Sequence, residues 1–103
     1  MKEKMQEIGF QMIAQVGMAK SSYIEAMYFS RDKKFEEAEA KIKEGDDFFK
    51  EAHHLHFDLV QKEAQGEDLP FSILFMHAED QLLNTETIKI MAEEIITLRK
   101  EIK

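Results

Sequence analysis

The stretch from Leu74 to Asn84, LFMHAEDQLLN, carries the side chains of this sequence that are best suited to chemistry. If the stretch is helical, four polar side chains fall within roughly 60 to 100° of one another. Apolar residues of the same stretch would cover a broad neighbouring face, so this polar stripe is expected to lie beside or inside packing surface. Polar groups there cost stability unless they are satisfied or used. The stripe consists of His77, Asp80, Gln81 and Asn84.

His77 is the candidate nucleophile of this stripe. A neutral imidazole can attack an electrophile at physiological pH and form a covalent intermediate. Asp80 at i+3 and Gln81 at i+4 would lie on the same side of a helix, where they could orient the imidazole or a bound group. The competing interpretation is a hydrogen-bonded core histidine, because a single histidine on a helix is a weak signal of function.

Three further histidines lie close together in the segment EAHHLHFD. His53 and His56 have the i, i+3 spacing with which two imidazoles can bind one transition-metal ion. No third ligand is evident, and a polar contact from His56 to another helix is the alternative. The sequence assigns no role to His54.

Composition excludes several classes of function. A net charge of −7, from 21 acidic and 14 basic residues, argues against nucleic-acid binding and against a polybasic membrane surface. The absence of cysteine excludes disulfides, thiolate zinc sites and cysteine nucleophiles, and it suits a reducing compartment. No apolar stretch approaches the roughly 18 residues that span a bilayer. We therefore expect a soluble, cytoplasmic protein without direct membrane insertion.

Common catalytic motifs are also missing. The sequence contains no Gly-rich phosphate loop, no HExxH or GxSxG motif and no calcium-binding loop. Covalent chemistry therefore depends on His77 and its neighbours.

Three long amphipathic helices are predicted to position these side chains. Apolar residues recur at spacings of three or four in the first and last thirds of the chain, and a seven-residue repeat runs through the middle third. The expected helices span residues 3–30, 33–64 and 70–102.

The expected helix ends rest on a few residues. Asp32 is the predicted N-cap of the second helix, Gly66 suits the residue after its C-cap, and Pro70 suits the first turn of the third helix. Gly17, in the middle of the first helix, is predicted to permit close contact with a neighbouring helix.

These elements predict an all-α fold, an antiparallel up-down-up bundle of three helices that forms a single domain over residues 1–103. Helices this long make a thin rod with wide apolar faces. Part of that surface is therefore expected to be buried between subunits.

The sequence resembles the IIA component of the lactose/cellobiose class, including diacetylchitobiose, of the phosphoenolpyruvate-dependent sugar phosphotransferase system. The likeness runs through IGFQMIAQVGMAKSSYIEA, FEEAEAKIKEGDDFFKEAHHLHFDLV and FSILFMHAEDQLL. The last segment is the most specific, because this family carries its phosphorylated histidine in an HA-[EQ]-D-x-L context. The matching residues are His77, Ala78, Glu79, Asp80 and Leu82.

This resemblance implies roles for individual residues and partners. His77 would accept a phosphoryl group from the phosphocarrier HPr, as a tele-phosphohistidine, and pass it to a cysteine of a IIB component, with a IIC permease involved indirectly. It also implies a homotrimer in which Asp80 of each subunit binds a divalent cation, Mg²⁺, on the threefold axis. Gln81 is a candidate donor to the phosphoryl group, and His53 is a secondary helper near the site.

Two hypotheses of different class follow. The first is a phosphoryl relay through His77 that serves the uptake of a β-disaccharide such as lactose, cellobiose or chitobiose. The second is a non-catalytic helical adaptor that retains the IIA fold, for which a long rod with wide apolar faces would suffice.

Overall fold

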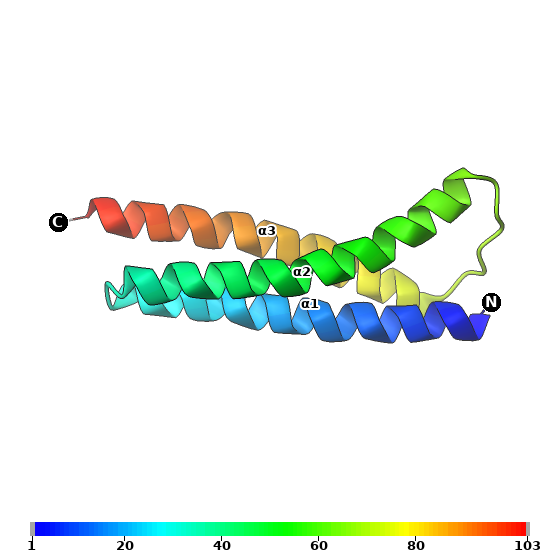
Figure 1. The fold of residues 1–103 in the computed structure, drawn as a ribbon, viewed down its shortest axis with the longest axis horizontal. Coiled ribbons are helices and arrows are strands. Elements are labelled where there is room, and N and C mark those ends of the chain that lie inside the picture. Colours follow the sequence, from blue (N-terminus) through cyan, green and yellow to red (C-terminus); the bar gives the residue numbers. More distant parts are fainter. Residues whose placement is uncertain (1, 103) are drawn as a thin grey trace.

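The computed structural model describes residues 2–102 and consists of three helices in an up-down-up arrangement (Figure 1). The rod measures 55 × 21 × 18 Å. The predicted all-α three-helix bundle is confirmed, and the described residues contain no strand. The helices are α1 (Lys2–Arg31), α2 (Phe35–Ala64) and α3 (Ile73–Glu101).

The turn between α1 and α2 differs from the sequence prediction. Lys33 adopts a left-handed backbone with φ of 61°, and the N-cap of α2 is Lys34, which makes no side-chain cap hydrogen bond. Asp32 as N-cap, and a second helix beginning at residue 33, were therefore wrong. The left-handed residue interrupts the helical backbone, so α2 cannot begin before it.

The link between α2 and α3 confirms one predicted end and corrects another. Gly66 has φ of 96°, a conformation that favours glycine after a helix C-cap, as predicted. Helix α3, however, begins at Ile73 and not at residue 70. Ser72 is its N-cap, because the Ser72 hydroxyl oxygen accepts a hydrogen bond of 3.1 Å from the Phe75 backbone N–H. Pro70 therefore lies in the linker.

Helix α1 is the centre of the bundle. It packs against both other helices, whereas α2 and α3 contact each other far less. In Figure 1 the C-terminal half of α2 turns away from α3, and an extended linker closes the gap. The buried residues of α2 lie at seven-residue intervals, in agreement with the repeat seen in the sequence: Ala38, Gly45, Ala52 and Leu59.

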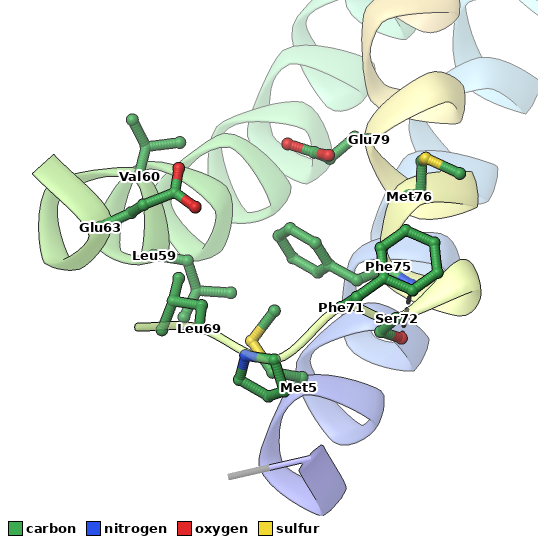
Figure 2. Close-up of a pocket in the computed structure, with 11 residues that line it drawn as sticks. Met5, Leu59, Val60, Glu63, Leu69, Phe71, Ser72, Phe75, Met76 and Glu79 are labelled. Carbon is green, nitrogen blue, oxygen red and sulfur yellow. Dashed lines mark hydrogen bonds between the residues drawn. The ribbon is translucent and has the colours of Figure 1, made fainter. Parts of the chain in front are cut away.

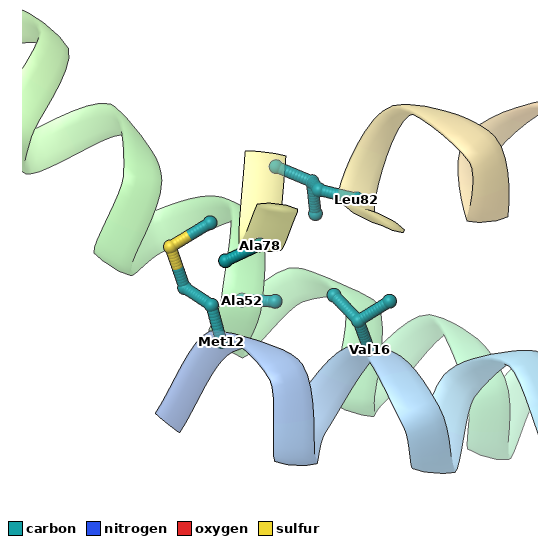
Figure 3. Close-up of a cluster of buried hydrophobic side chains, with 5 residues drawn as sticks. All are labelled: Met12, Val16, Ala52, Ala78 and Leu82. Atoms are coloured by element: carbon teal, nitrogen blue, oxygen red, sulfur yellow. The ribbon is translucent and has the colours of Figure 1, made fainter. Parts of the chain in front are cut away.

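Buried apolar side chains from all three helices meet at the level of the polar stripe (Figure 3). Small residues on α2 and α3 allow close approach, and larger side chains from α1 and α3 fill the space between them. This cluster fixes the rotation of α3 about its own axis. Its members are Met12, Val16, Ala52, Ala78 and Leu82.

The region of residues 17–49 and 86–101, here called the packed end, joins its helices through polar groups as well. Tyr23 is fully buried, and its hydroxyl donates a 2.7 Å hydrogen bond to the Asp46 carboxylate. Lys89 approaches the same carboxylate oxygen at 3.0 Å, so one cluster connects α1, α2 and α3. Burial, and then the hydrogen bond to Asp46, raise the pKa of Tyr23 above its ordinary value.

Gly45 and Gly17 are both helical glycines, but their surroundings are opposite. A Cβ atom on Gly45 would lie 2.6 Å from the Tyr23 ring, so glycine is required for that ring to fit. A Cβ on Gly17 would meet nothing within 4 Å, and Gly17 is exposed. The prediction of close helix contact at Gly17 is therefore wrong for the chain by itself.

The last turn of α3 completes the packed end. The Arg99 guanidinium donates hydrogen bonds to the Met27 carbonyl oxygen at 2.7 Å and to the Ser30 hydroxyl at 2.9 Å. A cation therefore satisfies a carbonyl in the last turns of α1, where the helix dipole is negative. Lys100 pairs with Glu39 and joins α3 to α2.

None of the helices in the described part of the chain has the length and apolar character to cross a bilayer.

Candidate functional site

His77 lies in the second turn of α3, in the region of residues 2–16 and 50–85 that we call the open end. Its side chain is exposed and makes no hydrogen bond or ion pair within residues 2–102. Ala78, the next residue, is fully buried, and Leu82 is also buried. The core therefore anchors α3 while it holds the imidazole at the surface. An imidazole placed in this way is accessible to a second protein.

The polar stripe lies at the edge of the core. Asp80 and Asn84 are exposed, and Gln81 is half-buried one turn beyond His77. Because His77 is exposed and makes no hydrogen bond within the described residues, the alternative of a hydrogen-bonded core histidine is wrong. The structure keeps His77, Asp80 and Gln81 on neighbouring positions of one helix, as the sequence predicts.

The histidines of α2 have other surroundings. The His53 ring lies between those of Phe49 and Phe57, with centroids 6.3 and 6.4 Å away and nearly parallel planes. His53 and His54 are exposed. Within residues 2–102, no three His, Cys, Asp or Glu side chains gather in a way that would hold a metal ion. The single chain therefore gives no support to metal binding by the α2 histidines.

His56 makes the polar contact to α3 that was the alternative interpretation. Its Nε2 lies 2.7 Å from Oε2 of Glu79, and its ring stacks on Phe75 with centroids 6.1 Å apart. Because the carboxylate can only accept, the imidazole N–H donates. Sequence reasoning missed this pair, since Glu79 had been considered only as part of a motif. Its two members lie 23 positions apart, so no local spacing could reveal them.

The outward face of α3 is apolar. Ile73, Met76, Leu83 and Ile90 are 73, 52, 61 and 54% exposed. With Asp80 and Thr87 they follow the alternating spacing of three and four that is typical of a coiled-coil seam. The face therefore has the pattern of a helix that packs against other helices, with Asp80 within it.

Comparison with known proteins shows the family of the chain. Residues 7–100 match the family described as PTS system, lactose/cellobiose specific IIA subunit. The chain belongs to this IIA family. Its members are phosphotransferase components of a sugar transport system. The resemblance recognised in the HAEDQLL segment is thereby confirmed at the level of the family.

Individual relatives cover nearly the whole IIA chain. It is 39% identical over 102 residues to the lichenan-specific phosphotransferase enzyme IIA component of Bacillus subtilis, covering 99% of this chain and 93% of the relative. It is 34% identical over 99 residues to the lactose-specific EIIA component of Staphylococcus aureus, covering 96% of each.

Two solved structures share the fold of this IIA chain. PtcA from S. mutans superposes with a TM-score of 0.95 at 34% identity, over 98% of this chain and 99% of that one. The cellobiose-specific enzyme IIA from Bacillus anthracis gives a TM-score of 0.88 at 39% identity, over 92% and 87% of the two chains. The agreement extends over 92% or more of this chain in both structures.

Proposed function

We propose that this IIA component is a phosphoryl relay that accepts phosphate from phospho-HPr on His77 and passes it to a cysteine of a IIB component. The observation that carries the proposal is the exposure of His77, without an intramolecular partner, in a segment that matches the family pattern. A relay between two proteins needs a nucleophile that both partners can reach. The exposed imidazole meets that requirement.

The chemistry needs little from the protein beyond position. The Nε2 lone pair of neutral His77 attacks phosphorus, a P–N bond forms, and the bond between phosphorus and the donor breaks. A cysteine thiolate of IIB then attacks phosphorus, a P–S bond forms, and the imidazole leaves. Such transfers depend on alignment and on stabilising the charged oxygens. Gln81, half-buried and one turn along α3, would donate an amide hydrogen bond to the phosphoryl group.

The proposal includes a homotrimer built on the outward face of α3. Four exposed apolar side chains at coiled-coil spacing would be buried if the α3 helices of three subunits met. Asp80 lies within this seam, so three carboxylates would come together on the axis. They would repel one another unless protonated or bridged by a cation.

The donor chemistry of Asp80 fits Mg²⁺. The Asp80 carboxylate is exposed and makes no hydrogen bond or ion pair within the described residues, and Mg²⁺ prefers carboxylate oxygen ligands. One chain offers a single such ligand, so the cation would belong to the assembly. Its role would be to relieve charge repulsion between subunits.

The names of relatives support a proposal for the substrate class. Proteins similar to this chain are named for lichenan, oligo-β-mannoside, lactose and cellobiose. We therefore propose that the relay serves the uptake of a β-linked sugar such as lactose, cellobiose or chitobiose through a IIC permease. The IIA component itself would act in the cytoplasm. The role of His53 as a helper of the site stays a prediction. Its ring lies on α2, between those of two phenylalanines.

A labelling assay tests the relay. The protein is incubated with radiolabelled phosphoenolpyruvate, enzyme I and HPr, and acid-labile phosphate on the chain is measured. We expect labelling of the wild type and of His54→Ala, whose side chain is also exposed, and no labelling of His77→Ala. Equal labelling of His77→Ala would exclude the relay. Such a result would favour the non-catalytic adaptor, which no separate observation supports.

Sedimentation tests the assembly. Wild-type protein is expected to sediment as a trimer, and Leu83→Glu as a monomer, since it would bury a charge in the seam. Val60→Glu is the matched control, because Val60 is exposed on α2 and outside the seam. Mg²⁺ should stabilise the wild-type trimer but not Asp80→Asn. A wild-type monomer at micromolar concentration would contradict this part of the proposal.

A further inference from the structure

A pocket of about 280 Å³ lies where α2 diverges from α3 (Figure 2). We call it the linker pocket, because the linker between these helices forms one wall. Met5 of α1 lies at its base, Leu59 and Glu63 of α2 on one side, and Phe75 and Glu79 of α3 on the other. The pocket therefore has walls from all three helices.

The walls combine apolar surface with negative charge. The apolar part includes the rings of Phe71 and Phe75. Met76 also lines the pocket, and the pocket shares this residue with the outward face of α3. The two carboxylates, Glu63 and Glu79, come from facing helices, and no Lys or Arg is among the described lining residues. The C-terminal turn of α2, which contains Glu63, adds the negative end of a helix dipole. Aromatic faces beside carboxylates favour an organic cation.

We propose that the linker pocket binds an arginine side chain presented by a segment of another protein. The guanidinium would form charge-assisted hydrogen bonds with Glu63 and Glu79 and lie against a phenylalanine ring. The methylene stem would cover the apolar wall. The overall charge of −7 would attract a basic segment to this surface.

The size of the pocket narrows the choice of ligand. Sites for drug-sized ligands have volumes of about 300–1,000 Å³, and this pocket lies just below that range. A pocket of this size has room for one long amino-acid side chain. Two carboxylates would also repel a phosphorylated ligand.

Glu79 is already held in place for such a contact. The 2.7 Å hydrogen bond from His56 Nε2 engages Oε2 of Glu79, which leaves the other carboxylate oxygen to accept. Stacking on Phe75 restrains the His56 ring in turn. A preorganised acceptor loses less side-chain entropy when the ligand binds.

The linker pocket is separate from the proposed phosphorylation site. Glu79 follows His77 by two residues, so the two side chains point about 160° apart around α3. His77 is not among the residues that line the pocket. The proposal therefore does not rest on the relay, and either can fail without the other.

An NMR titration of the assembled protein tests the proposal. The probe is the capped peptide acetyl-Gly-Arg-Gly-amide, and its counterpart carries citrulline, which has a similar shape without the charge. We expect the arginine peptide to shift backbone amide signals of residues 59–63 and 71–79, and the citrulline peptide to bind roughly tenfold more weakly. Free arginine is a third probe, which distinguishes binding of a peptide segment from binding of the free amino acid. It should bind more weakly than the capped peptide, because the pocket carboxylates would repel its own carboxylate.

Substitutions locate the site. Glu79→Gln and Glu63→Gln should each weaken binding of the arginine peptide roughly tenfold. Glu86→Gln is the matched control and should leave binding unchanged, since Glu86 is an exposed carboxylate on the same side of α3 outside the pocket. Equal binding of both peptides, unchanged binding in Glu79→Gln and Glu63→Gln, or tighter binding of free arginine would overturn the proposal.

Discussion

The packed end and the open end of this bundle differ in how they use polar side chains. At the packed end Tyr23, Asp46 and Lys89 satisfy one another between three helices. At the open end His56 pairs with Glu79, but His77 and Asp80 are exposed and have no partner within the described residues. Pairing of the first kind stabilises a fold, whereas side chains of the second kind are available to other molecules. The comparison teaches that the same three helices can satisfy polar groups between them in one region and keep candidate functional side chains accessible in another.

The largest expected difference in stability between the two ends comes from replacing one glycine in each end by alanine. Gly45→Ala should destabilise the protein by about 2 kcal/mol, because the new Cβ would overlap the Tyr23 ring. Gly9→Ala, at the open end, should be neutral or stabilise by up to about 1 kcal/mol. Its Cβ would meet Leu74 at an ordinary 3.5 Å. Urea unfolding of both variants measures the difference, and equal destabilisation would remove the contrast between the ends.

Tyr23→Phe should have the next largest effect. It removes the hydrogen bond to Asp46 and should cost about 1 kcal/mol at neutral pH. Because the pKa of Tyr23 is raised in the folded state, folding retains a proton that the unfolded chain loses. That stabilisation is fully present below about pH 10, the ordinary pKa of tyrosine, and is lost as pH rises further.

Urea midpoints between pH 7 and pH 11 test this pH dependence. The wild type should lose stability above pH 10 more steeply than Tyr23→Phe. Tyr28→Phe is the control, because Tyr28 is exposed and should leave the wild-type slope intact. A parallel decline of wild type and Tyr23→Phe would show that Tyr23 does not contribute to alkaline unfolding.

Thr85 lies close to where the two ends meet, and its substitution should have a smaller effect that raises stability. Its hydroxyl is fully buried and is the one buried side-chain oxygen or nitrogen without a partner among the described residues. Thr85→Val keeps the shape and removes this unpaired group, so it should raise stability by up to about 1 kcal/mol. Thr97→Val, at an exposed position of the same helix, is the control in thermal unfolding. Destabilisation by Thr85→Val alone would mean that the hydroxyl is satisfied.

Much of the fold follows from the sequence, because helical periodicity is a local signal. The buried residues of α2 lie at the intervals of its sequence repeat, and Gly66 marked the helix end. The start of α3 was missed, because a proline and a serine two residues apart are both good N-terminal signals. Only the geometry of the linker selects Ser72.

The site was less predictable, because exposure and long-range pairs depend on how the helices pack. Periodicity placed His77 near the core but did not decide whether it was inside or outside. The rotation of α3 about its own axis, with Ala78 and Leu82 buried, settles that question, and the separation of α2 from α3 creates the linker pocket. The pair of His56 and Glu79 is a contact between separate helices that no sequence spacing encodes.

Assignment of the phosphorylated nitrogen tests the central claim most directly. The protein is labelled with ¹⁵N in its four histidines, phosphorylated through HPr, and examined by NMR for coupling between imidazole nitrogen and phosphorus. We expect one phosphorus coupled to Nε2 of His77, with the other three imidazoles unphosphorylated. Phosphorus coupled to His53, His54 or His56, or to no imidazole at all, would contradict the account.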